Sequence, residues 1–256
     1  RTWLVMGNSL ALFCIAGIAI AALGWAFSPE LLSLLGTPEG AYGLALAYLR
    51  IIFLGMPFSF IMILLSGALR GVGDSITPLR ITVVNVLLDA GLNPLFIAGF
   101  GPIPAMGIEG SALATLIAGL VSVTMLVSRI YMKDLVIRLR GSDWRYLLPE
   151  AATLRKIVTL GVPMSLSMFV MSASSLVMIG LINREGVDTV AAYGVLVQVW
   201  NYVQMPAFAV SSAVSAMAAQ NIGAGKWDRV ERTAYAGSYI NAAMTAILLI
   251  VITIAI

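Results

Sequence analysis

The 256-residue sequence contains no histidine and a single cysteine, Cys14. Without histidine it lacks the commonest metal ligand and the commonest general base. One cysteine excludes an internal disulfide and a cysteine-rich metal site. Charged residues are also scarce, at 11% of the chain, whereas hydrophobic residues make up 60%. Soluble domains carry about 25% charged residues, so this composition predicts a polytopic membrane protein.

Long apolar runs indicate where the chain crosses the bilayer. A spanning helix needs about 20 mostly apolar residues. Seven segments meet this requirement and predict an all-α membrane protein with about seven transmembrane helices. They are 7–27, 42–67, 81–100, 111–127, 157–182, 190–219 and 234–256.

The basic residues lie in alternate loops. Of the 15 Lys and Arg residues, all but Arg50 and Arg184 fall on one side of the predicted topology. By the positive-inside rule that side is cytoplasmic. We therefore expect four transmembrane helices in residues 1–130, a cytoplasmic linker at 131–154 and three transmembrane helices in 155–256. The linker is expected to be solvated, although its basic residues could also contact anionic lipid.

Both ends of the sequence look cut. It begins at Arg1 without an initiator methionine and stops at Ile256 inside an apolar run. We expect an internal piece of a longer protein, whose partners are the lipid bilayer, a small-molecule substrate and the remainder of the parent chain. Nothing in the charge placement requires nucleic acid.

The third predicted span carries an acid, Asp89. On a helix its polar residues fall within about 80° of one another: Thr82, Asn85, Asp89 and Asn93. A carboxylate at membrane depth costs roughly 2.5–3.5 kcal/mol and faces protein or water rather than lipid. Asp89 could exchange a proton or bind Na⁺. The alternative is a buried acid that only ties two helices together.

Two later spans carry polar and methionine residues that could line a substrate cavity. Asn201 and Gln204 share a face of the sixth span, and Ser172 lies on the fifth. Met171 belongs to a row that recurs every seven residues in the fifth span, and methionine suits surfaces that accept varied apolar ligands. Ordinary helix packing is the alternative. No nucleophile–base set is visible, so the sequence predicts neither an enzyme nor a cofactor.

Three stretches match a known family: LRGVGDSITPL, LLDAGLNPLFIAGFGPIPAMGIEGSALAT and AAQNIGAGKWDR. Together they resemble the MATE family of multidrug and toxic compound extrusion transporters, and its DinF-like branch in particular. The resemblance implies twelve spans in two six-helix lobes, of which this chain would supply spans three to nine. It also implies export of bulky, mostly cationic amphiphiles in exchange for H⁺ or Na⁺ by alternating access.

The resemblance also implies site residues. An Asn…Asp pair on the family's fifth span maps onto Asp89 and Asn93 with the order exchanged, and a threonine on the sixth maps onto Thr115. With Asn85, these residues form the predicted cation-coupling set. A glutamate that some members carry on the seventh span would fall near Met171.

The predicted function is therefore a secondary antiporter in the plasma (inner) membrane of a bacterium or archaeon. The alternative within the same superfamily is a lipid-linked oligosaccharide flippase. A flippase would need several cations facing its cavity to hold a pyrophosphate, and only Arg50 is available inside a span. An intramembrane enzyme would need a histidine, paired acids or a Ser/Lys pair in the spans.

Overall fold

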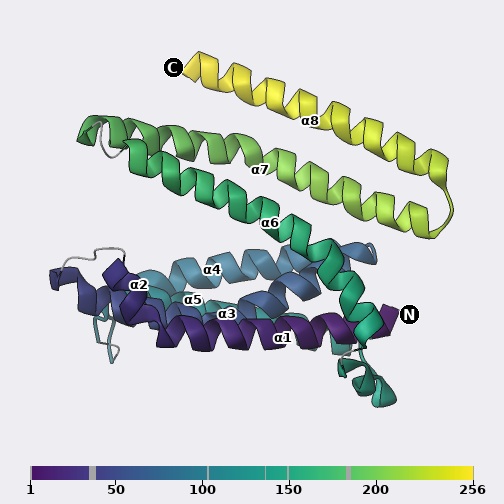
Figure 1. Ribbon diagram of the computed structural model, residues 1–256, viewed down its shortest axis with the longest axis horizontal. Coiled ribbons are helices and arrows are strands. Elements are labelled where there is room, and N and C mark those ends of the chain that lie inside the picture. Colours follow the sequence, from purple (N-terminus) through teal and green to yellow (C-terminus); the bar gives the residue numbers. More distant parts are fainter. Residues whose placement is uncertain are drawn as a thin grey trace. The chain divides into compact units, whose positions relative to one another are not determined.

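A computed structural model describes most of the chain, and its regular elements are helices (Figure 1). The described residues are 2–34, 39–102, 104–135, 137–148, 150–182 and 186–255. The predictions for Arg1, Arg184 and Ile256 lie outside them. The chain divides into two compact units, Arg1–Arg155 and Lys156–Ile256. The assignment of these parts to the two lobes of a transporter stays a prediction.

The first unit holds five α-helices and a short 3₁₀ helix, and three further α-helices follow. The former are α1 (Thr2–Ala26), α2 (Ser28–Leu34), α3 (Glu39–Gly71), α4 (Ile76–Ala98), α5 (Gly107–Met132) and η1 (Gly141–Leu147). The latter are α6 (Ala151–Ile182), α7 (Val187–Gly223) and α8 (Trp227–Ala255).

Six of the described helices are long and apolar enough to cross a membrane: α1, α3, α4, α5, α6 and α8. The expected sixth span lies in α7, which is a helix of 37 residues. No described stretch of α7 is apolar enough to count as a span with the other six. The polar residues Gln198, Asn201 and Gln204 lower its mean hydropathy. Its length exceeds the roughly 20 residues that a span requires. The expected helix is therefore present and long enough, and its apolar run is interrupted by amide side chains.

The end of the first unit that carries the basic loops holds its apolar core, where residues of α1, α3, α4 and α5 cluster. Its buried side chains come from these helices and from the segment after α5: Met6, Leu65, Leu69, Ile81, Leu126, Ile130 and Ile137. Because lipid tails are as apolar as leucine, burial alone gives helices little reason to associate in a membrane. Close packing through small residues must therefore contribute.

Small side chains recur on α5 at every fourth position, and all of them are buried: Gly110, Ala114, Ala118 and Ser122. A methyl group at Gly110 would lie 2.5 Å from the backbone oxygen of Phe96 on α4. Such spacing places small residues on one helix face and lets neighbouring backbones approach. Gly110 therefore sets how closely α4 and α5 can pack at this point.

Glycines also mark where other pairs of helices cross. On α1, a methyl group at Gly24 would overlap the ring of Phe53 on α3. In the second unit, a methyl group at Gly237 of α8 would overlap Val214 of α7, and these two helices lie side by side (Figure 1). Each crossing needs a residue without a β-carbon.

The segment 131–154 is not the purely solvated linker that we expected. Ile137 and Leu139 are buried against the first unit, and η1 packs on α1. Asn8 of α1 is only 1% exposed. Its amide nitrogen donates to the backbone oxygen of Tyr146 at 3.1 Å, and its amide oxygen accepts from the backbone N–H of Glu150 at 2.6 Å. The segment is thus fastened to the inner end of α1.

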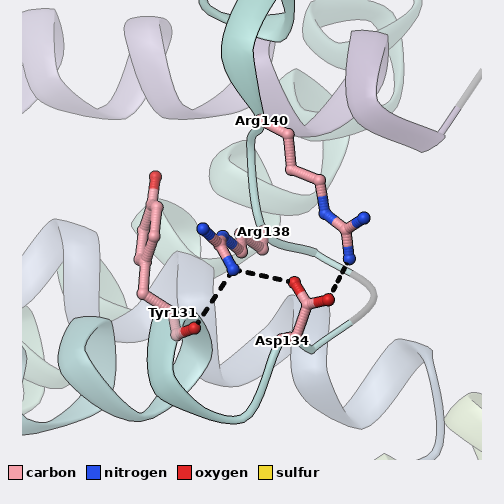
Figure 2. A network of polar contacts seen from close by, with 4 residues as sticks. All are labelled: Tyr131, Asp134, Arg138 and Arg140. Atoms are coloured by element: carbon pink, nitrogen blue, oxygen red, sulfur yellow. Dashed lines mark hydrogen bonds and ion pairs between the residues drawn. The ribbon is translucent and has the colours of Figure 1, made fainter.

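A polar network shapes the start of the same segment (Figure 2). The Asp134 carboxylate forms a salt bridge with Arg138 at 3.0 Å and a second one with Arg140. Arg138 also donates to the backbone oxygen of Tyr131 at 3.3 Å. Desolvation raises the pKa of Asp134, but the hydrogen bonds and charges of Arg140 and Arg138 outweigh it and hold that pKa below its ordinary value.

Asp74 caps the start of α4. Its carboxylate accepts a hydrogen bond from the backbone N–H of Thr77 at 2.9 Å, which satisfies one of the unpaired donors at a helix N-terminus. Burial raises the pKa of Asp74. Hydrogen bonds from Thr77 and Ile76 and the positive charge of Arg129 lower it by more than burial raises it, so the net pKa lies below its ordinary value.

Candidate cation-coupling site

Asp89 and Thr115 meet between two neighbouring helices. Asp89 is half-buried on α4, and its Oδ1 accepts a hydrogen bond from the Thr115 hydroxyl of α5 at 2.9 Å. The two residues are separated by 26 positions in sequence. The structure therefore joins the acid predicted from the polar stripe to the threonine predicted from the family resemblance.

The turn between α4 and α5 explains this pairing. The backbone N–H of Met106 donates to the backbone oxygen of Phe96 at 2.9 Å, and Gly110 packs against the same oxygen. From this crossing, Asp89 lies about 10 Å back along α4 and Thr115 about 8 Å along α5, at 1.5 Å per residue. Because α4 and α5 lie side by side and run antiparallel from this turn, the two side chains come to a similar depth.

Asn93 lies one turn beyond Asp89 but does not contact its carboxylate. Its amide nitrogen donates to the Asp89 backbone oxygen at 3.0 Å. Among the residues that the structure describes, Asn85 is half-buried one turn earlier and makes no hydrogen bond to Asp89. Both amides flank the acid, and their role in cation coupling stays a prediction.

A small cavity borders Thr115 on its other side. It encloses about 80 Å³ between α3 and α5. Besides Thr115, its wall includes Gly55 and Ser59 of α3 and Gly119 of α5. The volume exceeds the 10–15 Å³ needed for one water molecule. A water molecule therefore has room beside Thr115.

The donor set suits a hard cation. A carboxylate and a hydroxyl supply oxygen ligands, which alkali and alkaline-earth ions prefer. Among the described residues, no group of three or more His, Cys, Asp or Glu side chains gathers as a metal site would require. Asp89 with Thr115 is accordingly a two-residue site that can hold a proton directly, or contribute ligands to Na⁺.

The four predicted cavity residues lie in the part of the chain from α6 onward. Met171 and Ser172 are exposed on α6, where no residue is buried. Asn201 is exposed and Gln204 is half-buried on α7. The Met171 backbone oxygen accepts a hydrogen bond from Ser175 at 3.1 Å, which is a bond within the helix. Their place in a substrate cavity stays a prediction.

Arg50, the basic residue within the second predicted span, has a structural partner. Its guanidinium lies 4.5 Å from the centroid of the Trp25 ring on α1. Such a cation–π contact is worth about 0.5–2 kcal/mol. Trp25 itself was missed, since only the packing of α1 on α3 reveals it.

The fold matches that of known membrane transporters. A transporter of the MOP superfamily from Pyrococcus furiosus aligns with a TM-score of 0.80 over 93% of this chain and 57% of its own, at 22% identity. The outward-facing structure of a multidrug resistance MATE family transporter aligns with a TM-score of 0.79 over 97% of this chain and 54% of its own, at 23% identity. These likenesses show a multi-pass transporter fold.

The sequence comparisons identify the family within that class. The family sequence profile described as MatE matches residues 4–95 and 163–256. The chain therefore belongs to the MATE family, and the resemblance predicted from three stretches is confirmed. The probable multidrug resistance protein YoeA of Bacillus subtilis is 36% identical over 97% of this chain and 54% of its own length. YpnP of the same organism, also a probable multidrug resistance protein, is 36% identical over 83% of this chain and 46% of its own.

A more distant relative is named for a different substrate. The FAD transporter of Shewanella oneidensis is 27% identical over 88% of this chain and 49% of its own length. The chain spans about half the length of the curated relatives that it matches. These relatives are transporters rather than enzymes. The DinF-like branch and the numbering as spans three to nine stay predictions.

Proposed function

We propose that this chain forms about half of a secondary active antiporter, which exports drugs or other bulky, mostly cationic amphiphiles in exchange for H⁺ or Na⁺. The hydrogen bond from Thr115 to Asp89 carries the proposal. It places an acid and a hydroxyl together across two helices at membrane depth. The relatives YoeA and YpnP, both named as probable multidrug resistance proteins, support a multidrug cargo.

The exposure of this pair supports a cavity in front of it. Within the described residues Asp89 is only half-buried and Thr115 is exposed. An acid that faced lipid would cost several kcal/mol. We infer that this face of the α4–α5 hairpin turns toward further spans of the full-length protein or toward a water-filled cavity between its lobes.

Protonation of Asp89 supplies a physical switch. The ionised carboxylate accepts a charge-assisted hydrogen bond from Thr115, and such bonds are roughly twice as strong as neutral ones. A proton on the carboxyl removes that charge and weakens the hydrogen bond that joins α5 to α4. Na⁺ would instead draw both oxygens toward itself. Either cation drives alternating access only through different affinities for the two access states.

The flippase alternative has less support from this structure. A pyrophosphate would require a cluster of cations at the cavity, and Arg50 is stacked on Trp25.

The proposed location is the plasma membrane of a bacterium or archaeon, with the basic loops in the cytoplasm. This location follows from the positive-inside rule and from bacterial relatives such as YoeA.

The test is Asp89→Asn in the full-length protein, reconstituted in liposomes. Efflux of a fluorescent cationic drug is followed under a proton gradient and, separately, under a sodium gradient. We expect Asp89→Asn to abolish efflux under the gradient that drives the wild type. The control is Asp228→Asn, an exposed acid in the first turn of α8, which should retain efflux. Gradient-driven efflux by Asp89→Asn at the wild-type rate would refute the proposal.

A further inference from the structure

A groove runs between the inner ends of α4 and α5, away from the Asp89–Thr115 pair. It encloses about 560 Å³. Three cations lie along it: Arg80 in the early turns of α4, Arg129 in the last turn of α5, and Lys133 just after that helix. Val84, Met125 and Met132 supply apolar walls. The groove therefore has a charged mouth and an apolar length.

The charge at this mouth is net positive. Arg80 and Lys133 are exposed, and within the described chain neither forms a salt bridge. Arg129 is half-buried, and its positive charge lowers the pKa of Asp74, the nearby acid that caps α4. The next acid along the chain, Asp134, is held by Arg138 and Arg140. Two cations thus remain without an acidic partner.

The apolar walls continue from the mouth toward the middle of the span. Met132, the last residue of α5, is 85% exposed at the mouth, and Met125 is 39% exposed about two turns deeper, although both belong to a helix that can cross a membrane. Methionine is flexible and polarizable, so it adapts to irregular apolar ligands. An acyl chain is such a ligand, and it reaches this depth from the same side as the cations.

We propose that this groove is a binding site for one anionic phospholipid of the cytoplasmic leaflet. The headgroup phosphate lies between Arg80 and Lys133, and one acyl chain follows Met125 and Val84. The charge complementarity carries the assignment, because basic pockets between membrane helices on the cytoplasmic side suit anionic headgroups. The bound lipid would join the inner ends of the two helices that carry Asp89 and Thr115.

The test titrates dioleoylphosphatidylglycerol onto the full-length protein in detergent and counts bound lipids by native mass spectrometry. The double variant Arg80→Gln with Lys133→Gln removes both mouth charges. At about one kcal/mol for each basic residue near a lipid surface, we expect roughly thirty-fold weaker binding. The matched control removes Lys226 and Arg229, two exposed cations at the α7–α8 turn, and should leave this binding unchanged.

A second variant keeps every charge and fills the groove. Ser128 is an exposed residue of its wall, and Ser128→Phe should weaken phosphatidylglycerol binding while thermal stability is retained. Dioleoylphosphatidylcholine should bind weakly to all forms, and inorganic phosphate should not compete. Equal losses in the two double variants would show diffuse attraction and overturn the proposal. Unchanged binding by Ser128→Phe, full competition by phosphate, or a protein dimer in place of bound lipid would also overturn it.

Discussion

Thr115→Val removes the hydroxyl that contacts Asp89 and keeps the shape of the side chain. The bond measures 2.9 Å and joins a hydroxyl to a carboxylate. Hydrogen bonds to charged groups contribute about 1.5–3 kcal/mol, which corresponds to roughly 10- to 150-fold in an equilibrium constant. We therefore expect the half-saturating concentration of the coupling cation to change by at least about ten-fold.

The direction of that change distinguishes the two cations. If H⁺ drives transport, loss of the bond makes the charged carboxylate less stable. Half-maximal efflux is then reached at a lower proton concentration. If Na⁺ drives transport, loss of an oxygen ligand means that half-maximal efflux needs more sodium. The assay is drug efflux from proteoliposomes at a series of external pH values and, separately, of sodium concentrations.

Thr115→Ser is the matched control, because it keeps a hydroxyl at the same position. It should remain within about three-fold of the wild type, well below the ten-fold change expected for a lost bond. Two results would refute the reasoning. One is a Thr115→Val protein that folds and shows wild-type cation dependence in both series. The other is a Thr115→Ser protein that is as impaired as Thr115→Val.

Three further predictions concern the scaffold. Gly110→Ala places a methyl group 2.5 Å from a backbone oxygen of α4, and such overpacking should lower stability by about 1–3 kcal/mol, measured as a lower Tm in detergent. Asn8→Ala removes the two hydrogen bonds to the backbone groups of Tyr146 and Glu150, and should cost about 1–3 kcal/mol and expose that segment to limited proteolysis. Because the folded pKa of Asp74 is depressed, its contribution to stability is present above its ordinary pKa and is lost as the pH falls below about 4. Asp74→Asn should flatten that acid limb in pH-dependent unfolding.

Each scaffold prediction has a counterpart that should behave differently. Gly119→Ala lies on the same helix as Gly110, where a methyl group would meet nothing within 4 Å, and should leave Tm unchanged. Asn85→Ala removes a half-buried amide without such bonds and should leave the proteolysis of the 131–154 segment unchanged. Stability at neutral pH that is equal for the wild type and Asp74→Ala would contradict the capping role of that acid.

The membrane helices could be predicted because their signal is local. Twenty apolar residues in a row specify a spanning helix with little regard to neighbours, and six such helices appear as expected. The case of α7 shows the limit of that signal. Its helix forms, yet Asn201 and Gln204 interrupt its apolar run, and composition alone does not say what those amides contact.

The site could be predicted only in part. The polar stripe marked Asp89 because a lone acid in an apolar helix is costly. Thr115 carries no such signal, since threonine is tolerated in membrane helices, and only the family resemblance pointed to it. Asn93 was predicted to share the helix face of Asp89, and its amide bonds to the backbone of Asp89 rather than to the carboxylate. A stripe shows which residues share a face and not which atoms meet.

The sequence by itself determined the class of protein, the spans, the charge bias of the loops and the acid at membrane depth, because each follows from composition or from spacing along one helix. The tertiary structure alone decided three contacts: Thr115 with Asp89, Asn8 with the segment that follows α5, and Arg50 with Trp25. Each joins residues that are distant along the chain. Such pairs depend on how closely two helices approach and in which register, and here that depends on small residues such as Gly110 at the crossings.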